Sequence, residues 1–191
     1  MGNFSFQKTS IPGLIEINPF MVVDKRGYFS KFFEKTIFEE NGIPFEVVEE
    51  LASMSVKGTL RGLHFQNCHS QDKLVRVSQG AVYDVVVDLR RDSPTFGKWQ
   101  GFELTEENRT MLYIPKNFAH GFLTLSETAV MHYFCGDRYD AQSETGIIWN
   151  DVDLKIAWPL DKIETILISE RDKQFPSFQQ FIQINNKKSN T

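Results

Sequence analysis

Apolar residues along this chain form short runs that are separated, roughly every 8–12 residues, by glycine, proline, serine or asparagine. Some runs alternate apolar and polar positions, and others are rich in β-branched and aromatic residues, as is typical of strands. The pattern predicts strands over residues 4–8, 14–17, 18–24, 60–66, 73–78, 80–90, 98–104, 111–114, 121–125 and 129–134, and extended chain over 45–56. Residues 151–159 and 163–169 are the last segments that look regular.

One segment has a helical period. Phe32, Phe33, Ile37 and Phe38 share a stripe within residues 30–41, and Gly42 can end the helix. Because helices do not alternate with the strands elsewhere, we predict a mainly β protein, a jelly-roll β-barrel with a few short helices. We expect one domain over residues 1–184, followed by a polar, flexible tail over 185–191.

Composition narrows the function classes. The chain has 191 residues, 41% of them hydrophobic, and its 17 phenylalanines suit a β-rich interior or a subunit interface. A net charge of −4 gives no support to nucleic-acid binding. Two cysteines are too few for a disulfide framework, which favours a reducing cytoplasm. We find no apolar run that suits a membrane span or a signal peptide, so we expect a cytoplasmic protein without a membrane partner.

Residues 58–77, with the sequence GTLRGLHFQNCHSQDKLVRV, concentrate the candidate chemistry. Arg61 and His64 lie on one predicted strand, and Lys73 and Arg76 lie on the next. Neighbouring strands that both carry cations are unusual for a plain core. They suit a face that meets an anion, with His64 as a general base. The alternative is two half-exposed strands whose charges are solvated, and these residues alone leave both interpretations open.

Other candidate residues have ordinary structural explanations. His120, Tyr133 and Tyr139 can be turn or core residues, and Asp172 is one of 25 acidic residues. A metal site is the alternative for such a barrel, since metal-binding barrels usually carry two histidines one residue apart with a carboxylate soon after. The histidine nearest to His64 is five positions away, so we expect no metal.

Several motifs together resemble one family. GTLRGLHFQ at 58–66, QDKLVRVSQGAVYDVVVDLRRDSPTFGKW at 71–99, YIPKNFAHGFLTLS at 113–126 and ETGIIWNDVDLKIAWP at 144–159 are similar to motifs of the dTDP-4-dehydrorhamnose 3,5-epimerases. The resemblance extends from DKRGYF at 24–29 to SERD at 169–172. It implies a cupin-type barrel, a homodimer with exchanged N-terminal strands, no metal or other cofactor, and a nucleotide-diphospho-4-keto sugar as substrate for cell-surface polysaccharide synthesis.

The resemblance also implies roles for individual residues. The catalytic set is His64 as the base, Asp172 as its hydrogen-bond partner, Lys73 as the stabiliser of the enolate oxygen, and Tyr133 as the proton donor. Ligand contacts are implied for Arg26, Phe29, Arg61, His120, Tyr139, Glu144 and Arg171, with Arg61 and His120 at the diphosphate.

The chain departs from the family pattern toward the nucleotide end. Lys31 stands where the family has a glutamate, and Glu49, Glu50 and Leu51 stand where it has Gln-x-Asn. A carboxylate can accept hydrogen bonds from the N1–H and N2 groups of guanine, so these changes predict a preference for a GDP-linked 6-deoxyhexose or heptose. The alternative is a dTDP-4-dehydrorhamnose 3,5-epimerase proper.

Three functions stay open at this point. The chain can be an epimerase that inverts C3, C5 or both, a 3,4-ketoisomerase that moves the ketone on the same barrel, or a sugar-binding barrel without catalysis. A base with its aspartate, a lysine and a tyrosine favour an enzyme, because binding alone does not require all four. The LRGLH, KLVR and AHGF motifs favour the epimerase.

Overall fold

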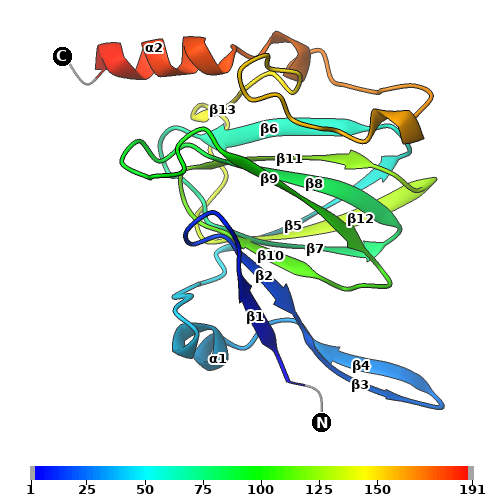
Figure 1. Ribbon diagram of the computed structural model, residues 1–191. Coiled ribbons are helices and arrows are strands. Elements are labelled where there is room, and N and C mark those ends of the chain that lie inside the picture. The colour runs from blue at the N-terminus through cyan, green and yellow to red at the C-terminus, as the bar shows by residue number, and fades with distance from the viewer. Residues whose placement is uncertain (1–2, 189–191) are drawn as a thin grey trace.

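Two antiparallel sheets face each other in the computed structural model of this chain, which describes residues 3–188 (Figure 1). The six-stranded sheet has the order β1 (Ser5–Lys8), β2 (Ile15–Asn18), β10 (Met111–Ile114), β7 (Lys73–Gln79), β12 (Thr128–Cys135) and β5 (Glu49–Val56). The five-stranded sheet has the order β13 (Glu144–Gly146), β6 (Leu60–Gln66), β11 (Phe118–Thr124), β8 (Ala81–Asp88) and β9 (Trp99–Thr105). The predicted mainly β, jelly-roll architecture is confirmed.

The space between the sheets is filled by apolar side chains from both inner faces. Val75 of the six-stranded sheet and Val82, Val86 and Leu104 of the five-stranded sheet are completely buried in this cluster. Each buried side chain of this size contributes roughly 1.5–3 kcal/mol to stability through removal of apolar surface from water. The alternating apolar positions therefore set which face of each strand points inward.

Each helix covers the outer face of one sheet. Phe38 of α1 (Lys35–Glu40) is buried against the six-stranded sheet, and Phe178 of α2 (Phe178–Lys188) packs on the five-stranded sheet. Figure 1 shows α2 along the top of the molecule, beside β6 and β13. Within the described residues, no helix is long and apolar enough to cross a membrane.

A separate two-stranded hairpin extends beyond the six-stranded sheet. It pairs β3 (Phe20–Asp24) with β4 (Gly27–Lys31), and Figure 1 shows it projecting from the lower end of the molecule. Its side chains Val22, Val23, Tyr28 and Phe29 are exposed. An exposed apolar patch of this kind marks an interaction surface.

Most predicted strands are present, with shifts of a few residues at their ends. The strand around His120 begins earlier than predicted, at Phe118, and so includes that histidine. The segments 151–159 and 163–169 are mostly irregular chain, with the short 3₁₀ helix η1 (Leu160–Lys162) between them and one parallel bridge between Thr59 and Leu167. Their apolar side chains, such as Leu154 and Trp158, pack on the five-stranded sheet without joining it.

The helix predicted over residues 30–41 is shorter than expected. Strand β4 takes the chain as far as Lys31, because pairing with β3 satisfies its backbone, and α1 begins only at Lys35. Phe32 is used elsewhere, since its ring lies 4.0 Å from the guanidinium carbon of Arg76. Gly42 follows the helix with φ of 77°, as its predicted role at the helix end requires.

Helix α2 was not predicted. Its signal is the spacing of Phe178, Phe181 and Ile182, which pack together on the five-stranded sheet. Once this first turn is docked, the helix continues through the polar residues 185–188, which the sequence analysis assigned to the flexible tail. Residues 189–191 lie outside the described residues.

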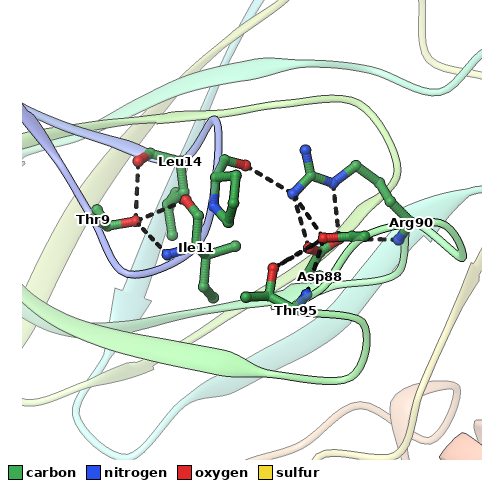
Figure 2. A network of polar contacts seen from close by, with 8 residues as sticks. Thr9, Ile11, Leu14, Asp88, Arg90 and Thr95 are labelled. Atoms are coloured by element: carbon green, nitrogen blue, oxygen red, sulfur yellow. Dashed lines mark hydrogen bonds and ion pairs between the residues drawn. The ribbon is translucent and has the colours of Figure 1, made fainter.

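The buried carboxylate of Asp88 links the loop between β1 and β2 to the five-stranded sheet (Figure 2). Asp88 at the end of β8 accepts hydrogen bonds from Arg90, with Nε at 2.9 Å and Nη2 at 2.8 Å, and from the hydroxyls of Ser93 and Thr95. The same guanidinium donates to the carbonyl of Pro12 at 2.7 Å. Burial alone would raise the pKa of Asp88, but these hydrogen bonds outweigh it and lower the pKa to about 2.

We predict that Asp88→Asn destabilises the fold in a pH-dependent way. At neutral pH the loss of a buried charge partner should lower the free energy of unfolding by roughly 3–5 kcal/mol. In the unchanged protein the carboxylate stabilises the fold above its ordinary pKa of 3.8, and this contribution disappears as the pH falls through about 2. Urea unfolding of both proteins from pH 7 to pH 2 should therefore show a difference that shrinks at acid pH. A difference that stays constant across that range would contradict this role of Asp88.

Candidate active site

A cavity of about 370 Å³ lies between the two sheets, at the end where β5, β6, β7, β11 and β12 meet the loop before β13. Seven of the eleven residues predicted to form the site line it: Arg61, His64, Lys73, His120, Tyr133, Tyr139 and Glu144. Most of the residues predicted for the site therefore meet in one cavity, although they come from distant parts of the chain.

An irregularity in β6 brings Arg61 and His64 to the same cavity. Simple alternation places residues 61 and 64 on opposite faces of a strand. In the structure β11 pairs His120 with His64 but Phe122 with Arg61, so β6 carries one extra residue at this point and the alternation is reset. The strands approach so closely here that a Cβ on Gly62 would lie 2.5 Å from the Cα of Gly121.

His64 is held by the carboxylate of Asp172. Its Nε2 lies 3.0 Å from Asp172 Oδ2, which also accepts the backbone N–H of Gly62 at 3.1 Å. Burial would raise the pKa of Asp172, but the hydrogen bonds from His64 and Gly62 outweigh it and hold the pKa well below the ordinary range. An ionised carboxylate can only accept, so Nε2 carries the proton and Nδ1 is left as the nitrogen that can take another.

Lys73 and Tyr133 enter the cavity from the opposite sheet. Both are half-buried, and burial lowers the pKa of Lys73 and raises the pKa of Tyr133. The Tyr133 hydroxyl lies 3.1 Å from Ser53 Oγ, a residue of β5 that also lines the cavity. The raised pKa means that Tyr133 is a phenol that keeps its proton, as a proton donor must.

His120 forms a second histidine–carboxylate pair. Its Nε2 lies 2.7 Å from Asp84 Oδ2, and only 5% of the histidine is exposed. The edge of its ring meets Tyr133, with 6.2 Å between the ring centroids. His120 thus lies deep in the cavity beside Tyr133, and its implied contact with a diphosphate stays a prediction.

A chain of polar contacts closes the rim of the cavity. The Tyr139 hydroxyl donates to Glu144 Oε2 at 2.8 Å, and the same carboxylate forms an ion pair with Arg171. Arg171 does not line the main cavity but an adjoining one of about 380 Å³, which shares Arg61 and His64 with it. Its Nε lies 3.4 Å from Asp172 Oδ1, so the rim is linked to the histidine pair.

Two predicted ligand contacts are not brought to the cavity. Arg26 and Phe29 lie on the β3–β4 hairpin, where Arg26 pairs with Asp24 at 2.6 Å and Phe29 is 66% exposed. Within this single chain they therefore do not complete the site.

Sequence reasoning missed several residues of the site. Gln66, Gln71 and Cys135 line the cavity, and Asp84 orients His120. Asp84 carried a usable signal, because a carboxylate inside the apolar run of residues 80–90 must be paired when it is buried. The others had no signal in one sequence. Among the residues that the structure describes, no group of three or more histidines, cysteines or acids could hold a metal ion.

Comparisons with known proteins match the sequence and the fold of this chain to one enzyme family. A family model described as dTDP-4-dehydrorhamnose 3,5-epimerase matches residues 8–180. The enzyme of that name from Methanothermobacter thermautotrophicus is 47% identical over 175 residues, which are 92% of this chain and 95% of the relative. The Legionella pneumophila dTDP-6-deoxy-D-glucose-3,5-epimerase, solved with dTDP-4-keto-L-rhamnose, is 42% identical with a TM-score of 0.89, covering 92% of this chain and 93% of its own. The 3'-monoepimerase ChmJ of Streptomyces bikiniensis, solved with dTDP-quinovose, is 33% identical with a TM-score of 0.87, covering 94% of this chain and 90% of its own.

We predict that Asp172→Asn slows proton transfer to His64 by roughly 10²–10⁴-fold. The asparagine can still accept from Gly62, but its amide offers His64 Nε2 a donor or a weaker acceptor, so the histidine loses its fixed tautomer. Deuterium uptake from heavy water into a bound 4-keto sugar measures this step. Nitrogen NMR of His64 in the same variant should show a mixture of tautomers where the unchanged protein shows one. Uptake within a few-fold of the unchanged rate would contradict this role of Asp172.

Proposed function

This chain belongs to the dTDP-4-dehydrorhamnose 3,5-epimerase family and is an enzyme of the isomerase class, and we propose that it inverts C3 and C5 of a dTDP-linked 4-keto-6-deoxy sugar. One observation carries the proposal. A base and a proton donor, His64 and Tyr133, line one cavity from opposite sheets. Epimerisation requires this arrangement, because the proton must leave one face of the sugar carbon and return to the other.

The proposed reaction runs through an enolate. His64 takes the proton from C3 or C5, and the electron pair of that bond moves toward the C4 ketone, whose oxygen becomes negative. Lys73 stabilises this oxygen by its charge, in a cavity where burial strengthens the interaction. Tyr133 then gives its proton to the carbon from the opposite face. The cycle leaves a protonated histidine and a phenolate, which exchange protons with solvent to restore the starting state.

The proposal names a dTDP sugar rather than a GDP sugar. The three relatives carry dTDP ligands or substrates in their names, which supports the alternative given in the sequence analysis and not the predicted GDP preference. The residues that suggested GDP, which depart from the family pattern, each contact another residue of the chain. Glu49 accepts the backbone N–H of Tyr139 at 2.9 Å, Glu50 lies 3.6 Å from His132, and Lys31 pairs with Glu34.

We further propose that two copies of the chain form a homodimer with exchanged N-terminal strands. The β3–β4 hairpin exposes Val22, Val23, Tyr28 and Phe29 away from its own cavity, and β5 is an unpaired sheet edge. A hairpin that reaches a second copy would bury these side chains and bring Arg26 and Phe29 to the cavity there.

The two free cysteines are compatible with the predicted cytoplasmic location, which stays a prediction.

We predict that Tyr133→Phe separates proton abstraction from inversion. The variant keeps the ring and loses only the hydroxyl, so the fold should survive and His64 should still remove the proton. Substrate in heavy water should then exchange its C3 or C5 hydrogen while inverted product falls by roughly 10²–10⁴-fold. His64→Asn is the matched control and should lose exchange and inversion together. Normal inversion by the Tyr133→Phe variant would show that another group returns the proton.

We predict that dTDP binds this protein at least about tenfold more tightly than GDP, which corresponds to roughly 1.4 kcal/mol. The expectation rests on the relatives, whose names carry dTDP sugars, while Glu49, the candidate guanine acceptor, is turned by Oε2 toward the backbone N–H of Tyr139. Calorimetric titration of each nucleotide into the protein measures the difference. Tighter binding of GDP would restore the preference predicted from the sequence and leave the epimerase proposal untouched.

A further inference from the structure

Tyr139 stands at the rim of the cavity on a segment that has no regular structure. Residues 136–143 connect β12 to β13, and the Tyr139 side chain is 48% exposed although it lines the cavity. Neither a helix nor a strand fixes the backbone of this segment. Its geometry must therefore come from side chains of other elements.

Gln66, at the end of β6, brackets Tyr139 on both sides. Its Nε2 donates to the carbonyl of Arg138 at 3.2 Å, and its Oε1 accepts the backbone N–H of Asp140 at 2.8 Å. The second proton of Nε2 goes to the carbonyl of His69 at 2.7 Å. Gln66 is only 7% exposed, so these bonds are shielded from water. Both amide protons are used within the protein, which leaves Gln66 no free donor for a ligand.

Two further side chains hold the same segment. Gln71 donates to the carbonyl of Asp137 at 2.7 Å, and Glu49 accepts the N–H of Tyr139 at 2.9 Å. Together with Gln66 they engage the backbone of every residue from 137 to 140. The hydroxyl of Tyr139 is fixed separately by Glu144. The residue is thus held at its backbone and at its hydroxyl, and it stays half-exposed at the rim.

We propose that Gln66 is a positioning residue, which acts on ligand affinity by holding Tyr139 at the rim of the cavity. This inference rests on the proposed function, because the ligand is the nucleotide sugar. The amide fits the task because one group must donate to a carbonyl before Tyr139 and accept from an N–H after it. A hydrophobic side chain of the same length can do neither, and a carboxylate can do only the second.

Two substitutions of Gln66 test the proposal, with Gln100 as the matched control. Gln66→Met keeps the size and removes all three hydrogen bonds. We expect KM for the nucleotide sugar to rise at least about tenfold while kcat stays within a few-fold. Gln100→Met should change neither value, since among the described residues the Gln100 amide accepts from the exposed Ser10 hydroxyl at 2.9 Å, and Gln100 does not line the cavity. An equal fall of kcat and kcat/KM in Gln66→Met would overturn the proposal.

Gln66→Glu adds a pH signature that loss of packing does not produce. A protonated glutamic acid can still donate one hydrogen bond, whereas its carboxylate faces the carbonyls of His69 and Arg138. The KM of this variant, relative to the unchanged protein, should therefore rise between pH 5 and pH 8.

In a Tyr139→Ala background, Gln66→Met should cause no further rise in KM, because its effect passes through the ring. A pH-independent KM or fully additive effects would each contradict the proposal.

Amide hydrogen exchange in the ligand-free protein separates this inference from the proposed function. Exchange of the amides of residues 137–140 should accelerate at least about tenfold in Gln66→Met and stay unchanged in Gln100→Met. This measurement requires no substrate, so it reports on the segment even if the protein acts on a different sugar. Unchanged exchange in Gln66→Met would overturn the positioning role. If exchange accelerates in Gln66→Met but the unchanged protein does not epimerise the sugar, the proposed function is wrong and the positioning role of Gln66 stands.

Discussion

The carboxylate of Asp172 joins the parts of the chain that the site requires. It lies in the short 3₁₀ helix η2 (Asp172–Gln174), and it reaches across to β6, where it accepts from both Gly62 and His64. One buried charge thus ties the C-terminal segment to the strand irregularity and to the base. Without these two donors a carboxylate that is 2% exposed would take up a proton, and the histidine would lose its acceptor.

The two sheets divide the chemistry between them. The five-stranded sheet supplies His64, His120 and Asp84, the segment after it supplies Asp172, and the six-stranded sheet supplies Lys73 and Tyr133. The core cluster packs side chains of both sheets together, so in the proposed reaction a sugar ring placed between the sheets would meet His64 on one side and Tyr133 on the other. Groups held in advance cost no reorganisation when charge develops on the substrate, which is where such sites gain most of their effect.

The sequence predicted the elements better than the contacts between them. Strands such as β6 and β10 follow from alternation and from β-branched residues, which are local properties. The meeting of Arg61 and His64 in one cavity does not, because it depends on an extra residue in β6 that only the pairing with β11 reveals. Helix α2 was hidden for a similar reason, since its few apolar residues matter only against the sheet that they cover. The predicted GDP preference lacks support from the relatives, which carry dTDP in their names, and the sequence did not reveal that Glu49 accepts the backbone N–H of Tyr139.

The central claim is that this cavity removes a proton from one face of a 4-keto sugar and returns one to the other. The most direct test is proton NMR of dTDP-4-keto-6-deoxyglucose with the unchanged protein in heavy water. The account predicts deuterium at C3 and C5 together with inverted configuration at both carbons, because the returning proton comes from a group that exchanges with solvent. A ketone that moves to C3, or a sugar that binds without taking up deuterium, would contradict it.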